Sequence, residues 1–321
     1  MIKKVFTSLI TLGILTYVGV FPVHAQQVSL GVYPPIIQID ATPPTSIKTT
    51  VTVQNLSPDP VDVDILLKPF KAAEDSNGTV SYLQDTNSLG GADPLIKQKI
   101  QILDNDHAVS SLSLAPQQQK TLTIHIGLQA DEPPSDYYFS IVFMSKNDVP
   151  NIGSAAVSTG GIATNVLLSI GPKTKASGFI KDFTGPLFVD HGPINFSLLL
   201  HNDSPFFIVP QGTVVIKNMF GQIIGKLKFL PVNVLAHSDR LIPDDTSGSQ
   251  TQLVWPEKAV FGPYSVTLTT ALTDQGPLFS KTIYFFAIPV QFIIGLILVI
   301  LIGVTIFLRI KYRLKLRQNV Q

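Results

Sequence analysis

The chain has 321 residues, of which 45% are hydrophobic and only 14% are charged, whereas about 25% charged residues is usual for a soluble domain. All 22 acidic residues lie between Gln26 and Tyr284 with 16 basic ones, a net charge of −6 that argues against nucleic-acid binding. The chain has no cysteine, which excludes disulfides, thiol catalysis and thiolate metal ligands, and favours a bacterial surface protein over a small secreted animal domain.

Residues 1–25 are typical of a secretory signal peptide. Lys3 and Lys4 precede an apolar run over Val5–Val20, and a small-residue cleavage pattern ends at Ala25. We therefore predict cleavage between Ala25 and Gln26. An uncleaved anchor is the alternative, but the apolar run is short and no stop-transfer pattern follows it. Because the segment has no cysteine, the protein is not a lipoprotein.

Short alternating runs between prolines and glycines dominate the region after the signal peptide. A period of two residues indicates half-buried strands, and these occur at Ile47–Gln54, Val61–Ile65, Leu112–Leu114, Leu122–Ile126 and Tyr264–Thr269. Asp93–Leu103 is the one plausible short helix or loop excursion. Regularly spaced strands without a long amphipathic helix predict an all-β fold, either a sandwich or a barrel.

Two segments of this region resemble each other. Asn55-Leu-Ser57-Pro58 ends one strand, and Asn202-Asp-Ser204-Pro205 ends another in the same way. Strands are expected after both, at Val61–Leu67 and Thr213–Lys217. Such a repeat suggests tandem domains of one kind. We predict two immunoglobulin-like β-sandwiches, at residues 28–172 and 177–286, joined by the polar stretch Gly171–Gly178.

The sequence offers no recognisable chemistry. There is no G-x-S-x-G elbow, H-E-x-x-H, Walker loop or G-x-G-x-x-G, and the six histidines lack metal-ligand spacing. His125 alternates with isoleucines and is expected on the polar face of a strand. Asp59, Asp62 and Asp64 could be calcium ligands, but the alternation favours the solvent face of a strand. We therefore expect no enzyme activity, no cofactor and no metal site.

Aromatic side chains are the candidate binding residues. Trp255 could stack on a sugar or anchor a partner, although a core or rim position is the favoured reading. Tyr137 and Tyr138 lie in a run that alternates in and out, so one ring should face the core and its neighbour solvent. Phe206 and Phe207 form an interaction patch if exposed, or a layer of the second core if buried.

The C-terminal end is typical of a single membrane span. No charged residue occurs between Thr282 and Leu308, and about 21 residues at 1.5 Å each cover roughly 30 Å of hydrocarbon. We place the transmembrane helix at 287–308 and a basic tail at 309–321. The tail holds Arg309, Lys311, Arg313, Lys315 and Arg317, and positive charges beside a span stay in the cytoplasm. The rest of the chain is then outside the cell membrane.

In architecture the chain resembles the WxL-interacting surface proteins of Gram-positive bacteria. The resemblance is carried by Thr50–Ser57, Val61–Leu67, Asn77–Tyr82, Leu114–Ile126, Pro134–Phe143, Phe261–Leu268 and Phe285–Pro289. It implies a peptidoglycan-binding first sandwich, a second sandwich, a membrane helix and a basic tail. The chain contains no W-x-L motif, so the resemblance implies that it is the interacting partner.

Together these patterns favour a membrane-anchored bacterial surface protein that attaches to cell-wall polymer or to a surface protein. The alternative is a surface assembly factor or chaperone that offers a strand edge of its immunoglobulin-like domains to a client. An enzyme with an unrecognised site is a third hypothesis, which no motif supports.

Overall fold

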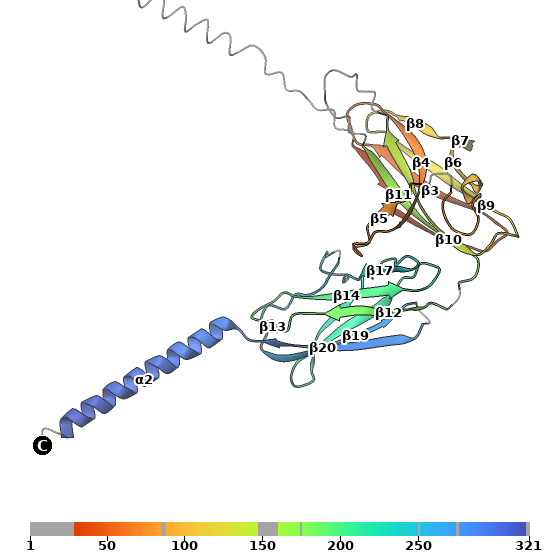
Figure 1. The fold of residues 1–321 in the computed structure, drawn as a ribbon. Coiled ribbons are helices and arrows are strands. Elements are labelled where there is room, and N and C mark those ends of the chain that lie inside the picture. The colour runs from red at the N-terminus through yellow and green to blue at the C-terminus, as the bar shows by residue number, and fades with distance from the viewer. Residues whose placement is uncertain are drawn as a thin grey trace, which may run out of the picture.

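The computed structural model describes residues 29–84, 88–146, 160–173, 175–249, 251–273 and 276–318. The predicted signal peptide and its cleavage between Ala25 and Gln26 lie outside these residues. The described chain is mostly β-sheet and ends in a long helix, α2 (Val290–Gln318) (Figure 1).

Within the described residues, two sheets form the N-terminal sheet pair. One sheet has the order β1 (Leu30–Tyr33), β3 (Thr45–Asn55), β9 (Gln119–Leu128), β6 (Ile100–Asp104) and β7 (His107–Ala108). The other has the order β2 (Ile36–Ala41), β11 (Gly161–Ile170), β10 (Ser135–Ser145), β4 (Val61–Ala72) and β5 (Val80–Tyr82), with β8 (Ser111–Leu114) also on β4.

One hydrophobic core lies between these two sheets. Alternate residues of β9 are fully buried, among them Leu122, Ile124 and Ile126, and they share the core with Phe139 and Phe143 of β10. Each such side chain contributes about 1.5–3 kcal/mol on burial. The core therefore explains why period-two segments far apart in the sequence pair here.

The C-terminal sheet pair is built in the same way around a second core. Its first sheet has the order β12 (Gly178–Thr184), β14 (Ile194–Asn202) and β17 (Ser238–Leu241), with β18 (Leu253–Trp255) also on β14. Its second has the order β13 (Phe188–Val189), β20 (Leu278–Ala287), β19 (Gly262–Ala271), β15 (Gln211–Lys217) and β16 (Ile223–Lys228).

Both sheet pairs have immunoglobulin-like strand order. In the N-terminal pair β1, β3, β9 and β6 form one sheet while β4, β10 and β11 form the other, as in the ABED and CFG sheets of that fold. The opening strand is split in each pair. Its first half pairs antiparallel in one sheet, and its second half (β2 or β13) pairs parallel with the last strand of the other.

Strands β17 and β18 both pair with β14, and a loop connects them. Asp244 is buried there and accepts hydrogen bonds from Thr246 N, Ser247 N and Val254 N at 2.7–2.9 Å. Burial alone would raise the pKa of Asp244, but hydrogen bonds from Ser247, Val254 and Thr246 outweigh it and lower that pKa to about 2. The ionised carboxylate therefore organises this loop.

The predicted strands are confirmed, and each extends further than its alternating run. Asp93–Leu103 is only in part the expected excursion, because the 3₁₀ helix η1 (Ile96–Lys99) is followed directly by strand β6. The predicted span began at residue 287, whereas Ala287 closes β20 and α2 starts at Val290. Helix α2 then continues through the basic residues to Gln318.

Helix α2 is long and apolar enough to cross a membrane. Its segment Ile293–Lys311 has a mean hydropathy of 2.9, and none of it is buried against the rest of the protein. By length and composition these are the properties of a membrane-spanning helix.

Candidate binding site between the sheet pairs

Two buried asparagines shape matching corners in the two sheet pairs. Asn55 ends β3 and donates to the carbonyls of Asp59, Leu114 and Ala115 at 2.7–3.2 Å. Asn202 ends β14 and donates in the same pattern, to the carbonyls of Phe206, Val234 and Leu235 at 2.8–3.1 Å. Each Oδ1 accepts from the backbone N–H two residues on. The repeat read from the sequence is therefore a repeated structural device.

The corner at Asn202 presents apolar side chains to the N-terminal sheet pair. It fixes the loops that carry Phe207 and Leu235, and these pack against Phe70 of β4 and Leu167 of β11 in a small buried cluster. Lys173 also lies over the Phe207 ring, with Nζ 4.1 Å from its centroid. This cluster is a third, smaller core that joins the two sheet pairs, and we call it the junction cluster.

A polar network lies beside the junction cluster. Asp136 Oδ2 accepts from Tyr138 Oη and from the Phe207 backbone N–H, both at 2.8 Å. The Ala236 N–H in turn donates to Tyr138 Oη at 3.3 Å. Burial, with the charge of Asp136 second, raises the pKa of Tyr138, so the phenol stays protonated and keeps donating to Asp136.

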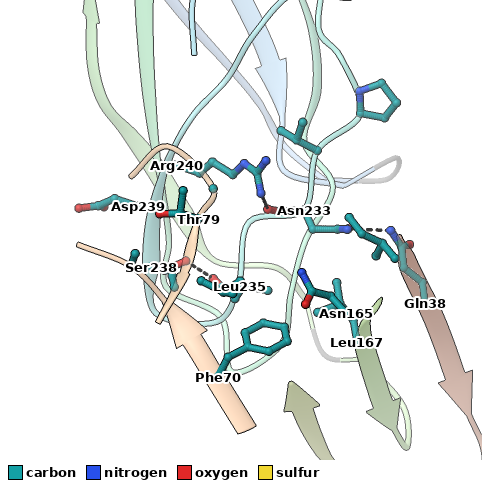
Figure 2. A pocket seen from close by; sticks show the side chains of 17 residues that line it. Gln38, Phe70, Thr79, Asn165, Leu167, Asn233, Leu235, Ser238, Asp239 and Arg240 are labelled. Atoms are coloured by element: carbon teal, nitrogen blue, oxygen red, sulfur yellow. Dashed lines mark hydrogen bonds between the residues drawn. The ribbon is translucent and has the colours of Figure 1, made fainter. Parts of the chain in front are cut away.

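Next to this network a cavity of about 190 Å³ opens between the sheet pairs (Figure 2). Its apolar wall includes Phe70, Leu167 and Leu235, and its polar wall includes Asn233 and Arg240. Hydrogen bonds cross the junction on either side of it. They join Gln38 Nε2 to Asn233 Oδ1 at 3.0 Å, and Leu241 N to Ser76 O at 2.8 Å. We call this cavity the junction cleft.

Arg240 is the positively charged residue that lines the junction cleft, and the acidic residue Asp239 lines it as well. Its Nη1 donates to Asn233 O at 2.8 Å, and its Nε is buried without a hydrogen-bond acceptor in the described part of the chain. The neighbouring carboxylate of Asp239 forms its ion pairs with Lys181 and His201 instead of with Arg240. Burial lowers the pKa of Arg240. No carboxylate within the described ranges forms an ion pair with this guanidinium.

Gly78 leaves the space in which the guanidinium lies. An added Cβ at Gly78 would come within 2.3 Å of Arg240 Cζ, and its φ of +84° is a conformation that favours glycine. Gly78 belongs to the turn before β5, in the N-terminal sheet pair. The charge is thus held between parts of the chain that are distant in sequence.

A half-buried guanidinium without a carboxylate partner can bind an anionic group. A buried charge without a partner is costly, and arginine presents donors in a fork that matches carboxylate or phosphate. The apolar side of the cleft suits a small group with an apolar body and an anionic head.

The structure brings together two of the five aromatic candidates. Tyr138 and Phe207 meet at the junction, next to the cleft. Tyr137 is buried in the N-terminal core, and Phe206 in the C-terminal core. Trp255 is only 4% exposed and packs against two other rings, Tyr264 and Phe285. The rings of these last three candidates offer no free face to a ligand, so for Trp255 the core reading holds.

The other flagged residues also have definite places. Asp62 and Asp64 lie on the outward side of β4, as the alternation predicts, and Asp64 pairs with Lys146 at 2.7 Å. His125 contacts Ser46 Oγ at 2.9 Å across the strands. Groups of three or more His, Asp or Glu placed to hold a metal are not found among the described residues. The basic residues Arg309, Lys311, Arg313, Lys315 and Arg317 all fall within α2.

Sequence reasoning passed over Arg240, although one signal was available. It is the only arginine in the chain outside the basic tail, in a region that otherwise uses lysine for every positive charge. Arginine and lysine differ most where a planar fork must bind an anion.

The strand order and the helix define the class of this chain. It is a mostly β-sheet, immunoglobulin-like protein with one C-terminal apolar helix. No protein-family model matches the sequence, and no curated protein matches it either.

Among solved structures, similarity is found to fimbrial chaperones. A chaperone–tip adhesin complex of CFA/I fimbriae has 10% identity and a TM-score of 0.37, covering 79% of this chain and 98% of the other. The class 5 fimbriae chaperone CfaA has 11% identity and a TM-score of 0.35, covering 81% and 100%. The Escherichia coli (E. coli) chaperone DraB has 16% identity and a TM-score of 0.33, covering 81% and 98%. At these scores the likeness carries no argument about function.

Proposed function

We propose that this chain is a membrane-anchored, non-enzymatic surface protein that binds a carboxylate-bearing partner in the junction cleft. The observation that carries the proposal is the guanidinium of Arg240, which lines the cleft between the sheet pairs and whose buried Nε has no acceptor among the described residues. A carboxylate there would accept from Arg240 and act as the counter-ion that none of the described residues provides. We take the two sheet pairs as tandem immunoglobulin-like domains that form the cleft together.

The membrane end supports the anchoring part of the proposal. Helix α2 can span a bilayer, and the basic residues from Arg309 onward favour a cytoplasmic C-terminus. The sheet pairs are then outside the cell membrane, where carboxylates occur on peptidoglycan stem peptides and on proteins. The resemblance to WxL-interacting proteins makes the wall polymer the first partner to test.

The test is sedimentation of the full chain, in detergent micelles, with insoluble peptidoglycan. We expect saturable binding that Arg240→Gln weakens by about 1.5–3 kcal/mol, or roughly ten- to hundredfold in Kd. The matched control is Lys226→Gln, which removes an exposed charge from β16 and should leave the Kd unchanged. Amidation of the wall carboxyl groups should reproduce the Arg240→Gln result. Equal binding by wild type and Arg240→Gln would contradict the proposal.

A second candidate is a surface assembly factor that receives a client strand. Its specific observation is the outer edge of β20, which pairs with β13 only at Phe286 and Ala287. Over Leu278–Phe285 no described strand covers that edge, and an open edge can add a strand from another chain. A photo-crosslinking residue at Thr282 should then yield an adduct with one protein in intact cells. Adducts with lipid alone, or none, would count against this candidate.

A further inference from the structure

The C-terminal sheet pair is tied closely to the start of the apolar helix. Only Ile288 and Pro289 separate the last residue of β20 from Val290 of α2. Ile288 N donates to Val189 O at 2.8 Å, so the connection is itself hydrogen-bonded to β13. Helix α2 leaves the sheet pair at the end where β13 and β20 lie (Figure 1). Two extended residues span about 7 Å. If α2 crosses a membrane, this end of the sheet pair must therefore lie at the membrane surface.

Large apolar side chains are displayed at this same end. Leu187, Phe188, Phe220 and Phe261 are between 61% and 77% exposed, and we call them the basal surface. Phe188 pairs with Phe286, next to the final residue of β20.

Two further contacts place the rest of the basal surface at the helix exit. Phe261 directly precedes Gly262, the residue that pairs with Ala287. The turn that carries Phe220 lies against Gly262 as well, because an added Cβ there would meet Met219 Cε at 2.4 Å. The four residues therefore lie at the end of the sheet pair from which α2 leaves.

Charged groups beside the basal surface limit how deeply it can enter a bilayer. Asp190 and His191 follow β13 directly, and a hydrogen bond from His191 lowers the pKa of Asp190, which stays ionised. Lys258 lies in the loop before Phe261 and is also exposed. Ionised groups of both signs suit the headgroup layer and not the hydrocarbon. Phe and Leu side chains are typical of the apolar face of interfacial segments, which lies at the boundary between headgroups and acyl chains.

We infer that the basal surface lies in the lipid headgroup layer and holds the C-terminal sheet pair on the membrane that α2 crosses. This inference rests on the anchoring part of the proposed function. Its occupant is lipid of the same bilayer, because the connection to α2 is too short to place another partner between them. The contact would fix the tilt of the sheet pair, and with it the distance of the junction cleft from the membrane.

The absence of cysteine from the chain allows a direct test by site-specific labelling. Phe220→Cys and Phe188→Cys place a fluorophore on the basal surface. The matched control is Leu278→Cys, which is 74% exposed at the opposite end of β20. Leu298→Cys reports on the helix itself. The full-length chains are reconstituted in phosphatidylcholine vesicles with lipids that carry bromine high on the acyl chain.

We expect the labels at Phe220 and Phe188 to be quenched severalfold more strongly than the label at Leu278. Quenching at Leu298 without any excess at Phe220 or Phe188 would overturn the inference and leave the anchor intact. Failure of quenching at Leu298 would overturn the anchor, and the basal contact with it.

Discussion

Replacement of Asn202 by alanine tests how the junction cleft is held. The buried amide donates to three carbonyl oxygens, and its Oδ1 accepts from Ser204 N at 2.9 Å. Asn202→Ala leaves all four backbone groups without this partner, in a place that solvent does not reach. Because one NH₂ group has two hydrogens, the side chain makes about three effective bonds, each worth about 1 kcal/mol. The expected loss is about 3 kcal/mol of the free energy of unfolding.

The assay is thermal unfolding of the full chain in detergent micelles, followed by circular dichroism. In a cooperative unit of this size about 1 kcal/mol corresponds to roughly 2–4 °C, so Tm should fall by about 6–12 °C. The matched control is Asn195→Ala, because Asn195 lies exposed on the same strand, β14. If the two variants unfold within about 0.5 kcal/mol of each other, the buried corner does not stabilise the fold as argued.

Three further predictions follow from the junction and from the Asp244 loop. Gly78→Ala should displace the Arg240 guanidinium and weaken sedimentation with peptidoglycan about as much as Arg240→Gln. Strain at the positive φ should lower the free energy of unfolding by only about 1 kcal/mol. Unchanged binding would show that the guanidinium does not contact the wall polymer. Phe207→Ala should lower the free energy of unfolding by about 3–5 kcal/mol and split calorimetric unfolding into two transitions. A single transition at a lower temperature would mean that the junction cluster does not couple the two sheet pairs. The hydrogen bonds of Asp244 outweigh its burial and lower its pKa to about 2, so its contribution is complete above about pH 4 and is lost as pH falls toward 2. The protection of the 245–249 amides from hydrogen exchange, relative to their intrinsic rates at each pH, should fall over that window in wild type and show no such fall in Asp244→Asn.

The regular parts of this chain could be read from the sequence because their signals are local. The alternation in Leu122–Ile126 predicts a strand whichever partner it finds, since the period of side chains along a strand is two. The turns after Asn55 and Asn202 are local too, although their full hydrogen-bond sets are not. Each asparagine amide reaches a carbonyl four residues away and two others on a distant loop.

Aromatic residues were harder to place from the sequence alone. Phe206 and Phe207 are neighbours with the same side chain, yet one joins the C-terminal core and the other joins the two sheet pairs. Alternation separates the two faces of a strand but does not tell which face meets water and which meets another part of the chain. For Trp255 the same ambiguity left both a core position and a binding position open, and its burial decides for the core.

By itself, then, the sequence determined the strands, the repeated corner and the apolar helix with its basic end, because period, length and charge order act over a few residues. Only the tertiary structure decided the candidate site, since Gly78 and Arg240 meet through the packing of two separate cores and no local pattern links them. The basal surface has the same origin. Its side chains come from three segments that are separate in sequence and gather only because β13, β15, β19 and β20 form one sheet.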